Sequence, residues 1–180
     1  MRALILLAAS AQAFSGTLRI EPTGLRSRRI ATSIVIERPV EACWSVVSDY
    51  ERLVDIMPSL TVCRRERGPA GRIRLYQETR APRGVPGLNE RQPITLDLTE
   101  FEGRRQVFSC VQSDMFESYD GETILTPCGT GRTEIRSTVE FKLKKRQIVM
   151  KGPQLLLLIE SSVRSKTPPD LEALKRAIES

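Results

Sequence analysis

The sequence predicts an α+β fold in which an antiparallel sheet is covered on one face by a C-terminal helix. A helical pattern lies between Pro39 and Pro58, directly after a short strand. Several later segments then alternate apolar and polar residues, and helical spacing returns from Gln154. Strands with one apolar face are typical of antiparallel sheets that pack on one side only.

The first elements are a strand and two helices. Residues 32–37, TSIVIE, form a β-branched run that predicts a strand, and Pro39 suits a first helical turn because its missing N–H has no helical partner there. YERLVDIMP predicts a second short helix that ends at Pro58. We expect Trp44, the only tryptophan, to pack in the core, with the mouth of a cavity as the alternative place.

The strands come next. The segments RIRLYQETR (72–80), ITLDL (94–98) and TEIRSTVEFKL (133–143) each alternate apolar and polar residues. Turn signals separate the strands, among them SYDGE at 118–122, and the proline-rich residues 81–93 predict a long loop. Four acidic residues lie in and just before the SYDGE segment, around its glycine, and we interpret them as solvated turn residues: Asp114, Glu117, Asp120 and Glu122.

Short polar side chains on the predicted apolar faces favour an internal cavity over a solid core. A buried polar atom without a partner costs about 1–3 kcal/mol, so these side chains should meet one another, water or a ligand. The predicted cavity-lining residues are Ile73, Leu75, Gln77, Thr79, Leu96, Leu98, Val107, Ser109, Val111, Ile135, Ser137, Val139, Leu155, Leu156 and Ile159. A core with internal hydrogen bonds remains the alternative.

Composition restricts the function classes. The formal net charge is +6, but residues 1–31 hold five arginines and one acid, so residues 32–180 carry only +2. That balance argues against a nucleic-acid partner. The chain has no histidine, which excludes catalytic triads and histidine-containing zinc sites, and its four cysteines form no C-x-x-C pair. We expect no catalytic residue, metal or cofactor, and we expect the cysteines to be buried thiols.

Residues 1–31 are predicted to be a cleavable presequence. An apolar run from Ala3 to Ala9 precedes Ala11-Gln12-Ala13, which has the pattern of a signal-peptidase site. Phe14 and a segment rich in Arg, Ser and Thr follow. Together they resemble the bipartite plastid-targeting presequence of algae with secondary plastids, which implies a plastid (chloroplast) protein. Simple secretion is the alternative, and the folded domain is expected to span 32–180.

Two segments carry a family resemblance: SIVIERPVEACWSVVSDYERLVDIMPSLTVCRRE and VQSDMFESYDGETIL. They resemble the polyketide cyclase/dehydrase and START-like (SRPBCC) lipid-transport family, especially its coenzyme-Q-binding-like and plastid members. Thr123-Ile124 stand where a tryptophan often follows the glycine. The resemblance covers about residues 32–179 and implies a helix-grip fold, β-α-α-β6-α, whose curved antiparallel sheet wraps a long C-terminal helix around an apolar cavity.

The resemblance implies non-enzymatic binding or transport of a hydrophobic small molecule, such as a lipid, prenylquinone or isoprenoid. The alternative is a cyclase/dehydrase-type enzyme with Tyr76, Glu78 or Arg80 near an apolar substrate, and a third possibility is a scaffold with a vestigial cavity. Basic residues in 142–151, beside an exposed Leu157, also predict weak peripheral contact with an anionic membrane.

Overall fold

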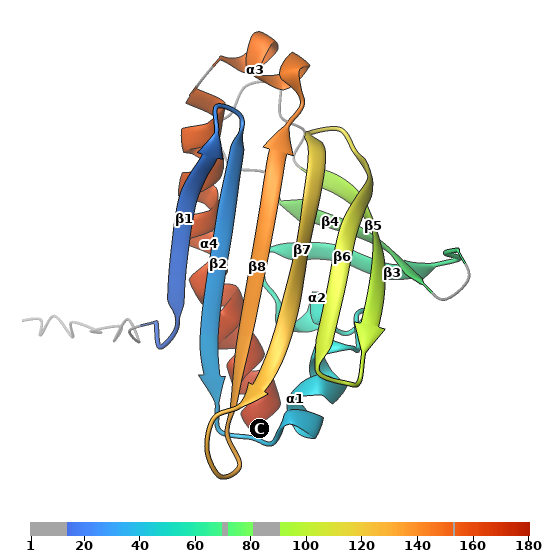
Figure 1. The fold of residues 1–180 in the computed structure, drawn as a ribbon, viewed down its shortest axis with the longest axis vertical. Helices are drawn as coiled ribbons and strands as arrows, with labels where there is room; N and C mark the ends of the chain where they lie inside the picture. The colour runs from blue at the N-terminus through green and yellow to red at the C-terminus, as the bar shows by residue number, and fades with distance from the viewer. Residues whose placement is uncertain (1–13, 70–71, 81–90, 153) are drawn as a thin grey trace, which may run out of the picture.

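The computed structural model describes residues 14–69, 72–80, 91–152 and 154–180, which form one curved sheet and helices on its concave side (Figure 1). The elements are β1 (Thr17–Gly24), β2 (Ser27–Ile36), α1 (Val40–Val47), α2 (Leu53–Ile56), β3 (Leu60–Glu66), β4 (Ile73–Arg80), β5 (Arg91–Phe101), β6 (Arg105–Ser113), β7 (Phe116–Pro127), β8 (Thr133–Leu143), α3 (Lys145–Lys151) and α4 (Gln154–Glu179).

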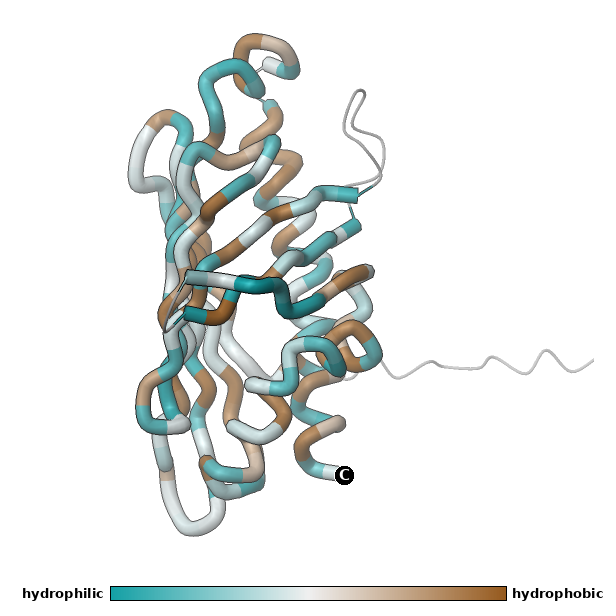
Figure 2. The backbone as a smooth tube through the Cα atoms, turned by 90° about the vertical axis from the view of Figure 1, so that its right-hand side faces the viewer, coloured by the Kyte–Doolittle hydropathy of each residue, from teal (hydrophilic) through white to brown (hydrophobic). Residues whose placement is uncertain are grey.

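The eight strands form one sheet in the order β1-β2-β8-β7-β6-β5-β4-β3, and every neighbouring pair is antiparallel. Figure 2 shows the helices on one side of this sheet, with α4 running along it. The predicted α+β, helix-grip arrangement is therefore confirmed. None of the helices in the described ranges is long and apolar enough to cross a membrane.

Two apolar clusters fix α4 on the sheet. Near its start, Leu155, Leu156 and Ile159 pack with Phe141 and Leu143 of β8. Near its end, a second cluster joins α4 to α1, β2, β7 and β8: Ile34, Ile36, Val40, Cys43, Val47, Leu125, Ile135, Leu174 and Ile178. Trp44 is partly buried and packs against this second cluster, so it lies at the edge of the core.

The sheet begins earlier than expected. β1 and the first half of β2 lie inside the segment predicted to be a presequence, so the folded domain begins before Thr32. Two of the arginines that indicated a targeting peptide have partners in the domain: Arg28 bonds Glu160 at 2.5 Å and Arg29 bonds Glu140 at 2.9 Å. An arginine-rich strand and an arginine-rich transit peptide have the same composition, and only the tertiary partners distinguish them. Residues 1–13, with the signal-peptidase pattern, lie outside the described residues.

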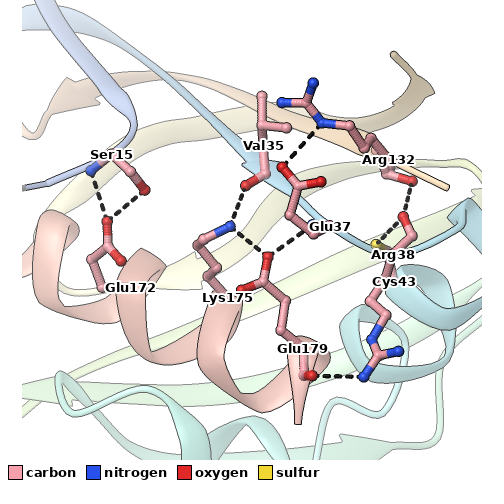
Figure 3. Close-up of polar contacts among 10 residues, drawn as sticks. Ser15, Val35, Glu37, Arg38, Cys43, Arg132, Glu172, Lys175 and Glu179 are labelled. Atoms are coloured by element: carbon pink, nitrogen blue, oxygen red, sulfur yellow. Dashed lines mark hydrogen bonds and ion pairs between the residues drawn. The ribbon is translucent and has the colours of Figure 1, made fainter. Parts of the chain in front are cut away.

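Polar contacts attach the C-terminal half of α4 to the N-terminal part of the chain (Figure 3). Glu172 accepts hydrogen bonds from the backbone N–H and the hydroxyl of Ser15, both at 2.8 Å. Lys175 donates to the carbonyl of Val35 at 2.8 Å, and Glu179 accepts from the N–H of Glu37 at 2.8 Å. The segment that includes Ser15 is therefore part of the domain.

The SYDGE segment is not a turn, contrary to the prediction. It lies within β7, and the turn comes earlier, between Ser113 and Phe116. A Cβ on Gly121 would lie 2.3 Å from the carbonyl oxygen of Thr138 and 2.7 Å from the Phe108 ring, so the glycine permits close packing in a strand. Two of the nearby acids form ion pairs within the sheet: Glu117 with Lys142 and Glu122 with Arg105.

Candidate ligand-binding cavity

Two adjoining cavities lie between the concave face of the sheet and α4. The inner one has a volume of about 340 Å³ and the outer one about 240 Å³. Both are lined by the same middle set of residues: Ile30, Gln77, Tyr119, Val163, Thr167 and Asp170. The two cavities therefore adjoin, and together we call them the chamber; the inner one alone lies within the volume range of small-molecule sites.

Most of the predicted lining residues face the chamber. They occupy alternate positions of β4, β5 and β8, with one residue on α4: Leu75, Gln77, Thr79, Leu96, Leu98, Ile135, Ser137, Val139 and Ile159. Alternate residues of a strand share a face, so the period-2 pattern identified them correctly. Ile73, Leu155 and Leu156 instead pack in apolar clusters beside the chamber.

The prediction for β6 was wrong by one residue. Val107, Ser109 and Val111 lie on the convex face, and Val111 is 48% exposed. Leu98 of β5 pairs with Phe108, and residues directly opposite each other point to the same side, so Phe108 faces the chamber. Both faces of β6 carry apolar residues, so alternation alone could not decide which face is buried.

Some polar groups on the chamber wall bond to each other. The hydroxyls of Thr123 and Ser137 are 3.2 Å apart, and the Gln77 side chain donates to the Cys63 sulfur at 3.4 Å. Internal hydrogen bonds and a cavity, which the sequence left as alternatives, therefore occur together. Thr123 was not predicted because the SYDGE segment was assigned to a turn.

Tyr50 lines the inner cavity. Its phenol donates a hydrogen bond to Glu100 at 2.5 Å, and the side-chain oxygen of Gln106 lies 3.0 Å away. Burial, reinforced by the Glu100 carboxylate, raises the pKa of Tyr50 far above its usual value. The phenol is therefore a neutral, fixed hydrogen-bond donor and not an acid–base catalyst at ordinary pH.

At the outer end, α4 is attached to β3 and β4 by two polar contacts. Asp170 accepts from the Ser59 N–H at 2.9 Å and from the Ser59 hydroxyl, and Lys166 donates to the Arg80 carbonyl. Burial raises the pKa of Asp170 above its usual value, although the Ser59 hydrogen bonds oppose the rise. Burial also lowers the pKa of Lys166. We call these two contacts the clasp.

An outer groove adjoins the outer cavity at the clasp. The groove has a volume of about 490 Å³ and shares Ser59, Arg80, Ser162, Lys166 and Asp170 with the outer cavity, and Leu158 also lines it. The clasp therefore lies between the chamber and the surface. Pro168 and Pro169 stand inside α4 just before Asp170, and since proline has no N–H, two helical hydrogen bonds are missing there.

The residues of the catalytic alternative are mostly outside the chamber. Tyr76 and Glu78 point to the convex face, where the Tyr76 phenol donates to Glu78 at 2.6 Å and the Arg64 guanidinium lies 4.3 Å from the ring centre. Only Arg80, at the end of β4, lines the chamber and its outer groove. Residues 76 and 78 lie between the inward-facing residues 75, 77 and 79, so the strand's alternation places them outside.

The cysteines are not all buried. Cys43 and Cys63 are buried, Cys110 is partly buried and Cys128 is exposed. Burial is the main cause that raises the pKa of the Cys43 and Cys63 thiols, which keeps both protonated near neutral pH. Within the described ranges, no group of three or more His, Cys, Asp or Glu residues could hold a metal ion.

Solved structures share this fold. The Zhui aromatase/cyclase from Streptomyces sp. R1128 matches with a TM-score of 0.71 at 17% identity, covering 85% of this chain and 94% of that one. A START superfamily protein from Mycobacterium smegmatis matches with a TM-score of 0.63 at 18% identity, covering 84% and 97%. Such low identity shows the fold alone.

Among curated proteins, no sequence matches this chain significantly. A family model does match, and it covers residues 27–179. Its span includes most of β2, which agrees with the early start of the domain in the structure. The chain belongs to the polyketide cyclase/dehydrase and lipid transport family.

Proposed function

We propose that this protein binds and carries a hydrophobic small molecule in the chamber, without chemical change to it. The observation that carries the proposal is the chamber itself, whose two adjoining cavities are lined by residues from Tyr50 to the clasp and mainly by apolar side chains. Burial of apolar surface there supplies about 25 cal/mol per Å² of binding free energy. The fold family, a hydrophobic ligand-binding fold, supports the same function.

The form of the chamber favours an elongated, mostly apolar ligand with one small polar group. The inner cavity is lined mostly by aliphatic and aromatic side chains, whereas polar side chains stand near the clasp, among them Ser59, Gln92 and Asp170. A lipid, a prenylquinone or an isoprenoid has this character. We place the polar group of the ligand at the clasp end, where hydrogen-bond partners and the surface are both near.

A cyclase/dehydrase-type enzyme is the second candidate, and Asp170 is the observation in its favour. Asp170 is a buried carboxyl on the chamber wall with a raised pKa, a combination frequent at catalytic sites. However, its carboxylate already accepts two hydrogen bonds from Ser59, and the chain has no histidine to act as a partner base. Carriage is therefore the better-supported function.

The direct experiment is mass spectrometry of organic extracts from the protein purified from its native source. Carriage predicts one apolar compound, at a ratio approaching one per chain, that is recovered unchanged after incubation with fresh protein. A compound converted by the parent but not by Asp170→Asn would establish the enzyme instead. Extracts that contain only traces of assorted lipids would contradict both functions.

We also propose a plastid location, with secretion as the alternative. The support is the apolar run followed by Ala11-Gln12-Ala13 and Phe14. A reporter fused to residues 1–31 should enter the plastid of an alga with secondary plastids, and Phe14→Ala should keep it outside. Unchanged import of the variant would contradict the bipartite mechanism.

A further inference from the structure

One end of the molecule concentrates exposed apolar side chains. Seven large hydrophobic residues are exposed in the described part of the chain. Five of them lie in the β1–β2 turn, in α3 or near the start of α4: Leu25, Val149, Met150, Leu157 and Leu158. Val149 and Met150 are 76% and 74% exposed, and Leu25, in the β1–β2 turn, is 97% exposed. Clusters of exposed apolar residues mark interaction sites, whereas single exposed apolar residues are common on protein surfaces and indicate no particular function.

The β1–β2 turn, α3 and the start of α4 meet at this end (Figure 1). Arg26, next to Leu25, connects the turn to the end of β8: its carbonyl accepts from the N–H of Leu143 at 2.9 Å, and its guanidinium donates to the Leu143 carbonyl at 2.5 Å. α3 follows β8 almost directly, and the start of α4 packs on α3. We call this surface the α3 end.

The same surface is strongly basic. Residues 142–151 contain five basic residues and no acid, and the first acid after Phe141 is Glu160. Lys145 and Arg146 are exposed, and the ammonium of Lys144 donates a hydrogen bond to the Ser113 carbonyl. The acids close to this surface are few: Glu117 bonds Lys142, and Asp114 lies 3.8 Å from Arg146.

We propose that the α3 end docks on an anionic lipid bilayer. Apolar side chains flanked by cations are the features of peripheral membrane contact, because the apolar groups enter the interface while the cations meet anionic headgroups. An acidic protein surface would suit the cations, but it would leave Leu25, Val149 and Met150 without an apolar environment. The bilayer satisfies both features of the surface.

The docking surface also lies beside the opening of the chamber. Leu158 belongs to the α3 end and lines the outer groove that leads to the clasp. A bilayer on the α3 end would therefore lie close to the route of ligand exchange. This role in exchange rests on the proposed function, whereas the docking itself does not.

The test is co-sedimentation of the full 180-residue chain with phosphatidylcholine vesicles that do or do not contain phosphatidylglycerol. We expect binding only to the anionic vesicles and much weaker binding at about 1 M salt than at about 0.1 M salt, because salt screens the charges. Lys145→Gln/Arg146→Gln should weaken binding roughly 25-fold, since each cation near an anionic surface contributes a factor of about five. Val149→Asp/Met150→Asp should weaken it by more than about tenfold.

Two matched controls change the same residue types elsewhere. Phe101→Asp removes an exposed hydrophobic residue at the other end of the sheet, and Arg52→Gln/Arg67→Gln removes two exposed cations. Both control variants should bind the anionic vesicles as strongly as the parent does. Residues 1–13 are the same in the parent and in the controls, so they cannot cause a difference in binding. Equal binding by the parent and the α3-end variants, or no binding by the parent, would overturn the proposal. Binding to polyglutamate through these residues without binding to vesicles would assign the surface to an acidic protein.

Failure of docking and failure of carriage are separable. Uptake of an apolar fluorescent probe, measured without vesicles, should be the same in the parent and in the α3-end variants. A parent that binds vesicles but takes up no probe would contradict carriage and leave docking in place. A parent that takes up the probe but ignores anionic vesicles would contradict docking alone.

Discussion

Asp170, on α4, accepts two hydrogen bonds from Ser59, which lies 111 positions earlier, just before β3. This pair joins the C-terminal helix to the edge of the sheet and borders both cavities and the outer groove. Its strength therefore affects both the stability of the fold and access to the chamber.

Asp170→Asn should change how stability depends on pH. Burial raises the pKa of Asp170 in the folded state above the usual 3.8, so the folded protein retains a proton that the unfolded chain releases. This group's contribution to stability is therefore full below about pH 4 and declines as the pH rises through the folded-state pKa. Asparagine cannot ionise, yet its amide oxygen can still accept from the Ser59 N–H.

Urea unfolding of the parent and of Asp170→Asn at about pH 4 and about pH 7 measures this effect. The variant should gain stability relative to the parent as the pH rises, and Ser59→Ala should reduce the stability of the parent by about 1–3 kcal/mol. If the free energies of unfolding of the parent and of Asp170→Asn differ by the same amount at both pH values, the pKa of the Asp170 carboxyl is the same in the folded and unfolded states.

All three tyrosine phenols should resist ionisation in the folded protein. Burial raises the pKa of Tyr119 to about 12, burial and the Glu100 carboxylate raise that of Tyr50 further, and the hydrogen bond to Glu78 raises that of Tyr76. Near-ultraviolet absorbance should therefore show clearly less tyrosinate in the folded protein than in the unfolded chain at about pH 11, where unfolded chains are largely ionised. Three phenols that titrate near their ordinary pKa of 10 in folded protein would contradict the described packing of Tyr50 and Tyr119.

Gly121→Ala should destabilise the fold because a Cβ there meets both backbone and ring atoms. The backbone oxygen of Thr138 would lie 2.3 Å away and the Phe108 ring 2.7 Å away. Over-packing of this kind costs about 1–3 kcal/mol. Phe108→Leu should rescue the variant only in part, since it relieves the ring contact and leaves the carbonyl contact unchanged. Unchanged thermal stability of Gly121→Ala would contradict the description of β7 as a continuous strand.

Removal of β1 should prevent normal folding. A chain that starts at Thr32 loses β1, half of β2 and the Ser15–Glu172 contact, and it leaves a new unpaired edge on the sheet. A chain that starts at Phe14 keeps all of these. We expect the shorter chain to aggregate or to melt well below the longer one in circular dichroism. Equal melting of the two chains would restore the domain boundary at residue 32.

The sequence predicted the elements that its alternation and helical spacing determine. The alternation of apolar and polar residues along the strands predicted that Leu75 and Ile135 line the chamber. The helical spacing of apolar residues predicted that Ile159 lies on the sheet side of α4. Both predictions were possible because the apolar residues of these elements lie on one face only. The fold class followed from the order of these elements.

The remaining features depend on contacts that local pattern does not determine. Phe108 and Val111 stand on opposite faces of β6 and are both apolar, so only pairing with β5 decided between them. Gly121 was interpreted as a turn residue because glycine is common in turns, whereas its role is to admit the Phe108 ring. Ser59 and Asp170 are too distant in the sequence for any local pattern to join them.

Ser137→Trp tests the central claim, that the chamber holds a ligand, most directly. Ser137 lines the inner cavity, so an indole there should occupy its volume, whereas Val111→Trp adds the same side chain on the exposed convex face of β6. We predict that Ser137→Trp folds with a stability change smaller than the 1–3 kcal/mol typical of an over-packed solid core, and that it loses uptake of an apolar fluorescent probe. Val111→Trp should take up the probe like the parent. Equal uptake by the parent and both variants, or a parent that takes up none, would contradict carriage in the chamber.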